Sequence, residues 1–334
     1  MRLSPFAVLA LVPLCASLPA AQKFSFRAEK GQKVEKSFES KLALDLDEMS
    51  VSIGGEEIPP EELGEVEISM ESTTKLQFLD THEEAGSGRP AKFTRKFVEL
   101  SGKNVESSSG GEGEAESDTK EETSELSGKT VRFAWNEEDS KFETTWEGDG
   151  GDDGLLEGLV EDTDLRVCLP SGDVAEGDKW ELDADAFRSM SDPGGDLALK
   201  EESDDEDDEK LSRDLRDNME GKLEATFKGL REVDGGKYAV IALEGEMKTK
   251  AEKAESGGEG HSSTMELALT FQVEGEILWD AAAGRAHSFE LDCAVAAKMA
   301  NVSRFEMENQ AFEMNQTLSF QGKLGASGSW TLGE

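Results

Sequence analysis

The chain has 334 residues, of which 74 are acidic and 35 are basic, so its formal net charge at pH 7 is −39. This excess of negative charge opposes binding to nucleic acid and to anionic membrane surfaces, because contacts to phosphate groups require the opposite sign. With three histidines and three cysteines, the chain also offers few ligands for a transition metal.

Residues 1–21 have the three parts of a secretory signal peptide. Arg2 supplies a positive charge, residues 6–14 (FAVLALVPL) are apolar, and the segment ends in small residues at Ala20 and Ala21. That apolar run is too short to span a bilayer, which needs about 20 residues. We therefore expect export, cleavage near Ala21, no transmembrane segment, and a final location in the periplasm, the cell envelope or the extracellular space.

Residues 22–192 are predicted to form an N-terminal β-rich half. In the strongest segments apolar residues alternate with charged ones, as they do on a strand with one buried and one solvated face. The expected strands are residues 38–46, 66–78, 93–100, 131–135 and 142–146.

Three acidic stretches are too polar to contribute to a core: residues 105–125, 147–154 and 201–209. Each lacks the apolar surface that would offset the entropy of ordering, so we expect mobile loops, the third of them inside an acidic linker over 193–212. None has the alternating carboxylates, central Gly and closing Glu of a calcium-binding EF-hand loop. We expect these loops to bind cations only weakly and non-specifically.

The C-terminal half, residues 213–334, contains the clearest strands. From Met265 to Trp279 every odd position except Gly275 is apolar, and residues 289–299 repeat the pattern after a turn that contains Gly284. A strand with only one apolar face belongs in an antiparallel sheet, because a parallel strand is buried on both faces. The two segments therefore predict a long β-hairpin.

Further strands extend this half into a meander. Phe312, Met314, Leu318, Phe320 and Leu324 are in phase on a third strand, and residues 223–227 and 238–243 flank a turn signal at 234–236. Short helices are indicated at 155–160 and 211–219. The predicted fold class is all-β, mainly two antiparallel, curved β-sheet or half-barrel halves with a few short helices and acidic disordered loops.

The length of the strand at 265–279 predicts curvature. Fifteen residues at roughly 3.3 Å each span about 50 Å, whereas ordinary strands have about five or six residues. Strands of that length coil or bend, and Gly275 offers a place to bend. The concave face would carry Phe, Leu and pliable Met side chains, including Met265, Met299, Met307 and Met314. The other half, the short helices or an apolar ligand would cover it.

The segment from Leu169 to Leu182 (LPSGDVAEGDKWEL) connects the two halves. A turn at Gly177-Asp178 would direct Trp180 inward at the start of a strand. This P-x-x-x-V-x-x-G-D-x-W pattern, followed by the hairpin with the turn at 280–285, resembles uncharacterised exported bacterial β-rich proteins, in which two β halves flank such a segment. The resemblance implies the fold and export, and it implies no activity.

We find no signature of catalysis, cofactor binding or metal binding. His82, His261 and His287 have no second His or Cys at ligand spacing, and no nucleophile or phosphate-loop motif is present. Cys168 and Cys293 remain after signal cleavage, and an oxidising compartment would allow them to form a disulfide. Two independent buried thiols are the alternative, since spacing alone does not decide.

These observations leave three functions open. The first is an exported, non-catalytic structural or interaction module of the cell envelope with an unidentified protein partner. The second is a carrier or sensor of a lipid-like apolar ligand in a curved-sheet cavity. The third is a secreted hydrolase, which rests on the abundance of carboxylates alone.

Overall fold

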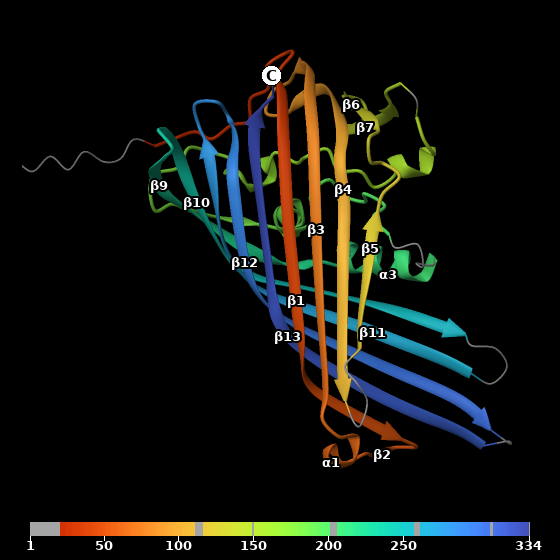
Figure 1. The fold of residues 1–334 in the computed structure, drawn as a ribbon. Coiled ribbons are helices and arrows are strands. Elements are labelled where there is room, and N and C mark those ends of the chain that lie inside the picture. Colours follow the sequence, from red (N-terminus) through yellow and green to blue (C-terminus); the bar gives the residue numbers. More distant parts are fainter. Residues whose placement is uncertain are drawn as a thin grey trace, which may run out of the picture.

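The computed structural model describes residues 21–110, 116–148, 150–200, 206–256, 261–307 and 310–333. The segment expected to be a signal peptide lies almost wholly outside these residues. Within them, thirteen strands form one antiparallel sheet (Figure 1). The strands are β1 (Lys33–Ile53), β2 (Glu56–Glu57), β3 (Val66–Ala85), β4 (Pro90–Gly110), β5 (Glu116–Thr123), β6 (Thr130–Asn136), β7 (Lys141–Trp146), β8 (Lys179–Leu182), β9 (Glu220–Val233), β10 (Gly236–Ser256), β11 (His261–Asp280), β12 (Arg285–Met307) and β13 (Gln310–Leu332).

The sheet is continuous across the two sequence halves. Its main order is β7-β6-β4-β3-β1-β13-β12-β11-β10-β9-β8, with β2 paired to β1 and β5 paired to β4. The junction is the pairing of β1 with β13, which runs from Val34 opposite Leu332 to Ile53 opposite Met314. The all-β class is confirmed. The two strand-rich halves, however, share a single open sheet and do not form two separate sheets, because the first long strand pairs with the last.

The alternating pattern sets the two faces of the sheet as expected. β11 and β12 form the predicted hairpin, with Phe271 opposite Val295 and Val273 opposite Cys293. All four side chains are buried on the same face. Gly284 closes the turn at a φ of 69°, a left-handed conformation that suits glycine. Its carbonyl accepts a hydrogen bond from the backbone N–H of Arg27, which ties the N-terminal residues to this turn.

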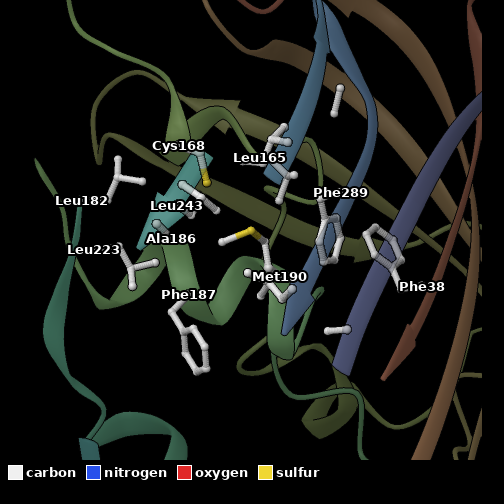
Figure 2. Close-up of a cluster of buried hydrophobic side chains, with 14 of the residues drawn as sticks. Phe38, Leu165, Cys168, Leu182, Ala186, Phe187, Met190, Leu223, Leu243 and Phe289 are labelled. Atoms are coloured by element: carbon white, nitrogen blue, oxygen red, sulfur yellow. The ribbon is translucent and has the colours of Figure 1, made fainter. Parts of the chain in front are cut away.

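Two stretches of the chain, residues 153–168 and 184–200, fill the concave face over part of its length, and we call them together the covering segment. It contains the short 3₁₀ helices η1 (Asp153–Leu156) and η2 (Arg166–Cys168) and the helix α2 (Ala184–Ser191). Asp183 caps α2 by accepting a hydrogen bond from the N–H of Asp185. Figure 2 shows Phe187 and Met190 of α2 and Leu165 beside the sheet residues Leu243 and Phe289. All are buried, so the main core lies between this segment and the sheet.

The covering segment reaches only part of the sheet. We call the end where β1 begins and β13 ends the proximal end, and the opposite end the distal end. In Figure 1 the covering segment lies beside the proximal half, at the top, whereas the long strands extend well beyond it and diverge toward the bottom. The helix α3 (Glu206–Asp217) packs on β10 near the boundary, and the short helix α1 (Pro60–Leu63) lies at the distal end.

The acidic stretches are more ordered than we expected. Residues 105–110 continue β4 and residues 116–123 form β5, whose register pairs Val105 with Thr119. The strands form because backbone pairing and polar cross-strand contacts, such as the Ser107–Ser117 hydrogen bond of 3.1 Å, do not require apolar side chains. Likewise, residues 206–209 begin α3, so the prediction of a loop there was wrong. Residues 111–115 and 201–205 lie outside the described residues.

The two helix predictions were partly correct. The leucines at 211 and 215 lie on α3, as their spacing indicated, whereas Met219 follows its end. Near residue 155 the structure has only the one-turn helix η1, so Leu159 and Val160 are outside it. The segment that resembles exported β-proteins includes β8, where Trp180 donates a hydrogen bond of 3.0 Å to the carbonyl of Cys168. This bond connects the sheet edge to the covering segment.

Candidate functional site

A buried ionic cluster joins the sheet to the covering segment. Lys36 of β1 and Asp80 of β3 form an ion pair of 2.7 Å, and Lys36 forms a second pair of 2.7 Å with Asp164 of the covering segment. Arg95 of β4 binds the Asp80 carboxylate with both Nε and Nη2, at 2.8 and 2.9 Å. The Lys36, Asp80 and Arg95 side chains are at most 1% exposed. Two positive and two negative charges are thus neutralised inside the protein.

Arg95 also holds the covering segment directly. It donates to the carbonyls of Val160 and Glu161 at 3.0 and 2.9 Å and to the hydroxyl of Thr163 at 2.7 Å. The guanidinium carbon lies 5.2 Å from the ring centres of Phe78 and Phe133. A bidentate guanidinium with further acceptors has its donors well satisfied, which is the condition under which a buried ion pair is tolerated.

The charges in this cluster are fixed at neutral pH. Burial alone would raise the pKa of Asp80, but Arg95 and Lys36 outweigh it and hold that pKa well below its usual range. The Asp80 carboxylate raises the pKa of Arg95 despite its burial. Neither Asp80 nor Arg95 is poised to exchange a proton near pH 7, so this pair is suited to holding the covering segment in place.

The distal part of the concave face is apolar and incompletely covered. The register places Leu267 of β11 opposite Met299 of β12, Met299 opposite Leu318 of β13, and Leu318 opposite Met49 of β1. These side chains form an apolar row across four strands. We define the distal apolar face by this row and its neighbours on the same side of the sheet: Leu46, Met49, Ile53, Ile68, Met70, Met265, Leu267, Leu269, Met299, Phe305, Phe312, Met314 and Leu318.

Burial divides this face from the proximal core. Phe289 and Val295 of β12 are each 1% exposed, whereas Met299, farther along the same strand and in the same phase, is only half-buried. On β13 the change runs from Trp330, 2% exposed, to Phe312, 36% exposed. Every member of the distal apolar face is half-buried or exposed. The opposite face at the same level carries polar residues such as Thr317 and Lys298.

Polar groups cross the apolar face near its distal end. Asn301 of β12 lies opposite Gln316 of β13, and both share the concave side with Met299 and Leu318. Asn301 accepts a hydrogen bond of 3.0 Å from Ser263 of β11. The face is therefore apolar with one band of side-chain amides, and both amides are half-buried.

A separate cleft of about 1280 Å³ opens between the covering segment and α3. Leu155, Leu159 and Leu197 are on its apolar wall, and Arg188 and Arg216 are on its charged wall. Both arginines are already engaged: Arg188 with Asp185, and Arg216 with Asp196 at 3.2 Å. Asp192 and Glu161 also line the cleft, and desolvation raises the pKa of both carboxyls, that of Asp192 to about 6. Arg216 lies 3.7 Å from Asp192 and opposes that shift.

The three histidines lie far apart in the fold. His82 is on β3, buried between the rings of Phe26 and Phe93, and His287 stacks on Tyr238 with ring centres 4.1 Å apart. His82 lies within β3 and His261 begins β11. β3 extends beyond residue 78, where the predicted strand ended, and its buried positions there are Asp80 and His82. No group of His, Cys, Asp and Glu in the described residues could hold a metal ion.

Cys168 and Cys293 are free, buried thiols in this structure. Cys168 is on η2 in the covering segment and Cys293 is on β12. Burial raises the pKa of both thiols, that of Cys293 to about 12. A protonated, buried thiol is unreactive, so neither cysteine is suited to be a nucleophile.

Sequence reasoning found parts of this arrangement and missed others. It expected an apolar concave face with Met265, Met299, Met307 and Met314. The structure brings Met265, Met299 and Met314 to one face, and the side chain of Met307 lies outside what the structure describes. Sequence reasoning did not single out Lys36, Asp80 or Arg95. The available signal was a charged residue in the apolar phase of a strand: Lys36 lies between Val34 and Phe38, and Arg95 between Phe93 and Phe97.

Comparisons with known proteins give no family. No protein-family model matches the chain, and no curated protein matches it. Among solved structures, the COG4313 outer membrane channel from Pseudomonas putida F1 aligns over 96% of this chain and 100% of its own, with 9% identity and a TM-score of 0.16. A mutant porin of Rh. blastica aligns over 89% and 100%, with 9% identity and a TM-score of 0.12. Among the described helices, none has the length and apolar character needed to span a bilayer.

Proposed function

We propose that this protein is an exported, non-catalytic interaction module of the cell envelope, and that it binds its partner on the distal apolar face. One observation carries the proposal: the same face of the same strands is buried in its proximal half and only partly buried in its distal half, where Ile53 and Phe312 are exposed. A contiguous apolar surface that is left partly open to water is typical of a binding surface. The signal peptide expected at 1–21 supports export.

The absence of catalytic machinery is part of the proposal. The buried charged groups Lys36, Asp80 and Arg95 are fully engaged in ion pairs, and the pKa values of Cys168 and Cys293 are raised. Catalytic acids, bases and nucleophiles instead need pKa values close to the working pH and access to substrate. Asp192 in the cleft has a pKa raised to about 6 and is the observation that favours a hydrolase. We rank that function behind the other two because Asp192 is paired with Arg216.

Binding of Nile red, a neutral dye that fluoresces in apolar surroundings, tests the proposal. Leu318 points to the distal apolar face and Thr317, its neighbour on β13, points to the opposite face. We expect the mature chain to increase the dye's emission, Leu318→Glu to lose most of that increase, and Thr317→Glu to retain it. An equal effect of the two substitutions, or no increase with the unmodified chain, would refute binding at this face.

A lipid-like ligand is the second candidate. It is favoured by the partly buried row of Leu267, Met299, Leu318 and Met49, which carries no polar group. Native mass spectrometry of the gently purified mature chain would detect a retained lipid. Consistently bare protein that also fails to bind a fluorescent fatty acid would eliminate this candidate.

A further inference from the structure

We propose that the occupant of the distal apolar face is a polypeptide segment that carries lysine or arginine beside its apolar residues. This inference rests on the proposed function, because it names the class of partner that binds there. Three observations support it: an acidic margin beside the face, a band of amides within it, and its methionine content.

The acidic margin adjoins the apolar face through the strand register. Met70 of β3 is opposite Glu106 of β4, and Glu106 is opposite Asp118 of β5, so the three share one side of the sheet. Glu116 and Glu122 of β5 are on that side too, with Lys120 between them. Neighbouring strands are about 4.8 Å apart, so these carboxylates lie within one or two strands of the apolar surface. Four carboxylates against one ammonium favour a cationic partner.

The amide band favours a polypeptide over a hydrocarbon chain. A hydrocarbon laid across Asn301 and Gln316 would remove water from their amides and supply no hydrogen bond in return, which is unfavourable. A polypeptide backbone offers both N–H donors and carbonyl acceptors to such amides. The serine hydroxyl of Ser263 already donates to Asn301, so the band is ordered before a partner arrives.

The methionines suit a surface that accepts more than one sequence. Met49, Met70, Met265, Met299 and Met314 are on the distal apolar face, and the whole chain has ten methionines. The unbranched, polarisable Met side chain adapts to differently shaped partners, and Met-rich surfaces bind amphipathic segments with little sequence preference. The face therefore selects by apolar content and positive charge, and it does not read one fixed motif.

The net charge of the chain disfavours an anionic membrane or micelle as the occupant of the apolar face. At −39, the protein is repelled by anionic headgroups, so binding of this face to such surfaces is unfavourable. A basic amphipathic peptide combines the charge that the margin attracts with the apolar surface that the face needs to cover.

Two synthetic peptides test the inference with the full mature chain. One alternates Leu and Lys in an amphipathic pattern, and the other has Glu at every Lys position. We expect the Leu/Lys peptide to bind about tenfold more tightly or better, with an affinity that falls as salt is raised, because exposed charges are screened. Fluorescence anisotropy of labelled peptide measures both affinities.

Matched variants locate the interaction. Glu106→Gln combined with Asp118→Asn removes two carboxylates of the acidic margin, whereas Asp45→Asn combined with Glu121→Gln removes two from the opposite face. All four residues are exposed, so both variants should fold. The first pair should weaken binding of the Leu/Lys peptide severalfold, and the second should leave it unchanged. Leu318→Gln should weaken binding more than Thr317→Gln does.

The outcomes separate this inference from the proposed function. Equal, salt-independent binding of the two peptides, reduced by Leu318→Gln, would overturn the charge selection and leave binding at the face intact. A lipid would be the better candidate for the occupant if two results came together. Lysophosphatidylcholine, below its micellar concentration, would displace the bound peptide, and Glu106→Gln/Asp118→Asn would change peptide binding no more than the control pair does. Nile red and peptide binding that are both insensitive to Leu318 would overturn the inference and the proposed function together.

Discussion

Arg95 donates two hydrogen bonds to Asp80, at 2.8 and 2.9 Å, across adjacent strands of the sheet, and both side chains are at most 1% exposed. The same guanidinium donates to two carbonyls of the covering segment. This pair therefore joins the neighbouring strands β3 and β4 to the covering segment.

Breaking this pair should be severely destabilising. Arg95→Met leaves Asp80 with one of its two cationic partners, and loss of one member of a buried pair costs about 3–5 kcal/mol of the free energy of unfolding. Urea denaturation measures the loss. The control is Arg231→Met, which removes a pair with Glu276 on an exposed surface and should cost about 1 kcal/mol or less. Similar losses for the two variants would contradict the role assigned to Arg95.

His82 should make the fold sensitive to mild acid. Neither of its ring nitrogens has a hydrogen-bond partner among the described residues, and burial lowers the pKa of the ring below its usual value near 6.5. Because the unfolded chain binds a proton there more readily than the folded chain, stability is full above pH 6.5 and declines as the pH falls below it. Asp164 and Asp80 oppose this shift, and Lys36 and Arg95 reinforce it.

We expect His82→Phe to reduce the loss of stability between pH 7 and pH 5, since phenylalanine keeps the ring contacts with Phe26 and Phe93 and cannot be protonated. Chemical denaturation at the two pH values compares the variant with the original chain. An unchanged pH dependence would show that His82 is not the group responsible. The Asp80 carboxylate acts at lower pH, with stability lost only as the pH falls below about 4.

The proximal and distal parts of the concave face should differ in how much they stabilise the fold. Phe289 is 1% exposed and Phe312 is 36% exposed. Phe289→Ala should cost about 3–5 kcal/mol through lost burial and a cavity, and Phe312→Ala about 1 kcal/mol or less. Thermal or urea unfolding provides both values. A large cost at Phe312 would mean that the distal face serves stability and not binding.

The register of β11 can be tested by insertion. One residue inserted after Leu269 would turn every side chain on one side of the insertion onto the opposite face of the sheet, because successive side chains of a strand alternate. Each core side chain so exposed costs roughly 1.5–3 kcal/mol, and the sum exceeds the stability of an ordinary domain. The insertion variant should fail to give a cooperative unfolding transition. A soluble, cooperatively melting variant would show that the register shown here is incorrect.

Cys168 and Cys293 should resist alkylation in the folded protein. Burial raises the pKa of each thiol, so little thiolate is present and access is poor. Iodoacetamide should modify neither residue under native conditions and both after denaturation, as measured by intact mass. A chain that stays unmodified after denaturation without reductant, and is lighter by two hydrogens, would instead show the disulfide.

Much of the fold could be predicted because its signal is local. Alternation along β11 and β12 identifies one buried and one solvated face, and the Gly284 turn joins the two strands within a few residues. The pairing of Val34 with Leu332 has no such signal, since it brings together the first and the last long strand of the chain. For that reason the sequence suggested two halves where the structure has one sheet.

The polar strand β5 shows a second limit of local reasoning. Its residues have no apolar pattern, and composition alone indicated disorder over 105–125. Pairing with β4, which is itself held by β3, supplies the hydrogen bonds that order it. This tertiary support also places Asp118 beside Glu106, and so creates the acidic margin.

By itself, the sequence determined that the chain is acidic, that its main strands are antiparallel and long, and that these strands have one apolar face, because charge and side-chain alternation are properties of neighbouring residues. Only the tertiary structure decided which strands meet, where Lys36, Asp80 and Arg95 bury their charges, and how far the covering segment extends. Those depend on contacts between residues far apart in the chain, and they leave Leu318 and its neighbours only partly buried.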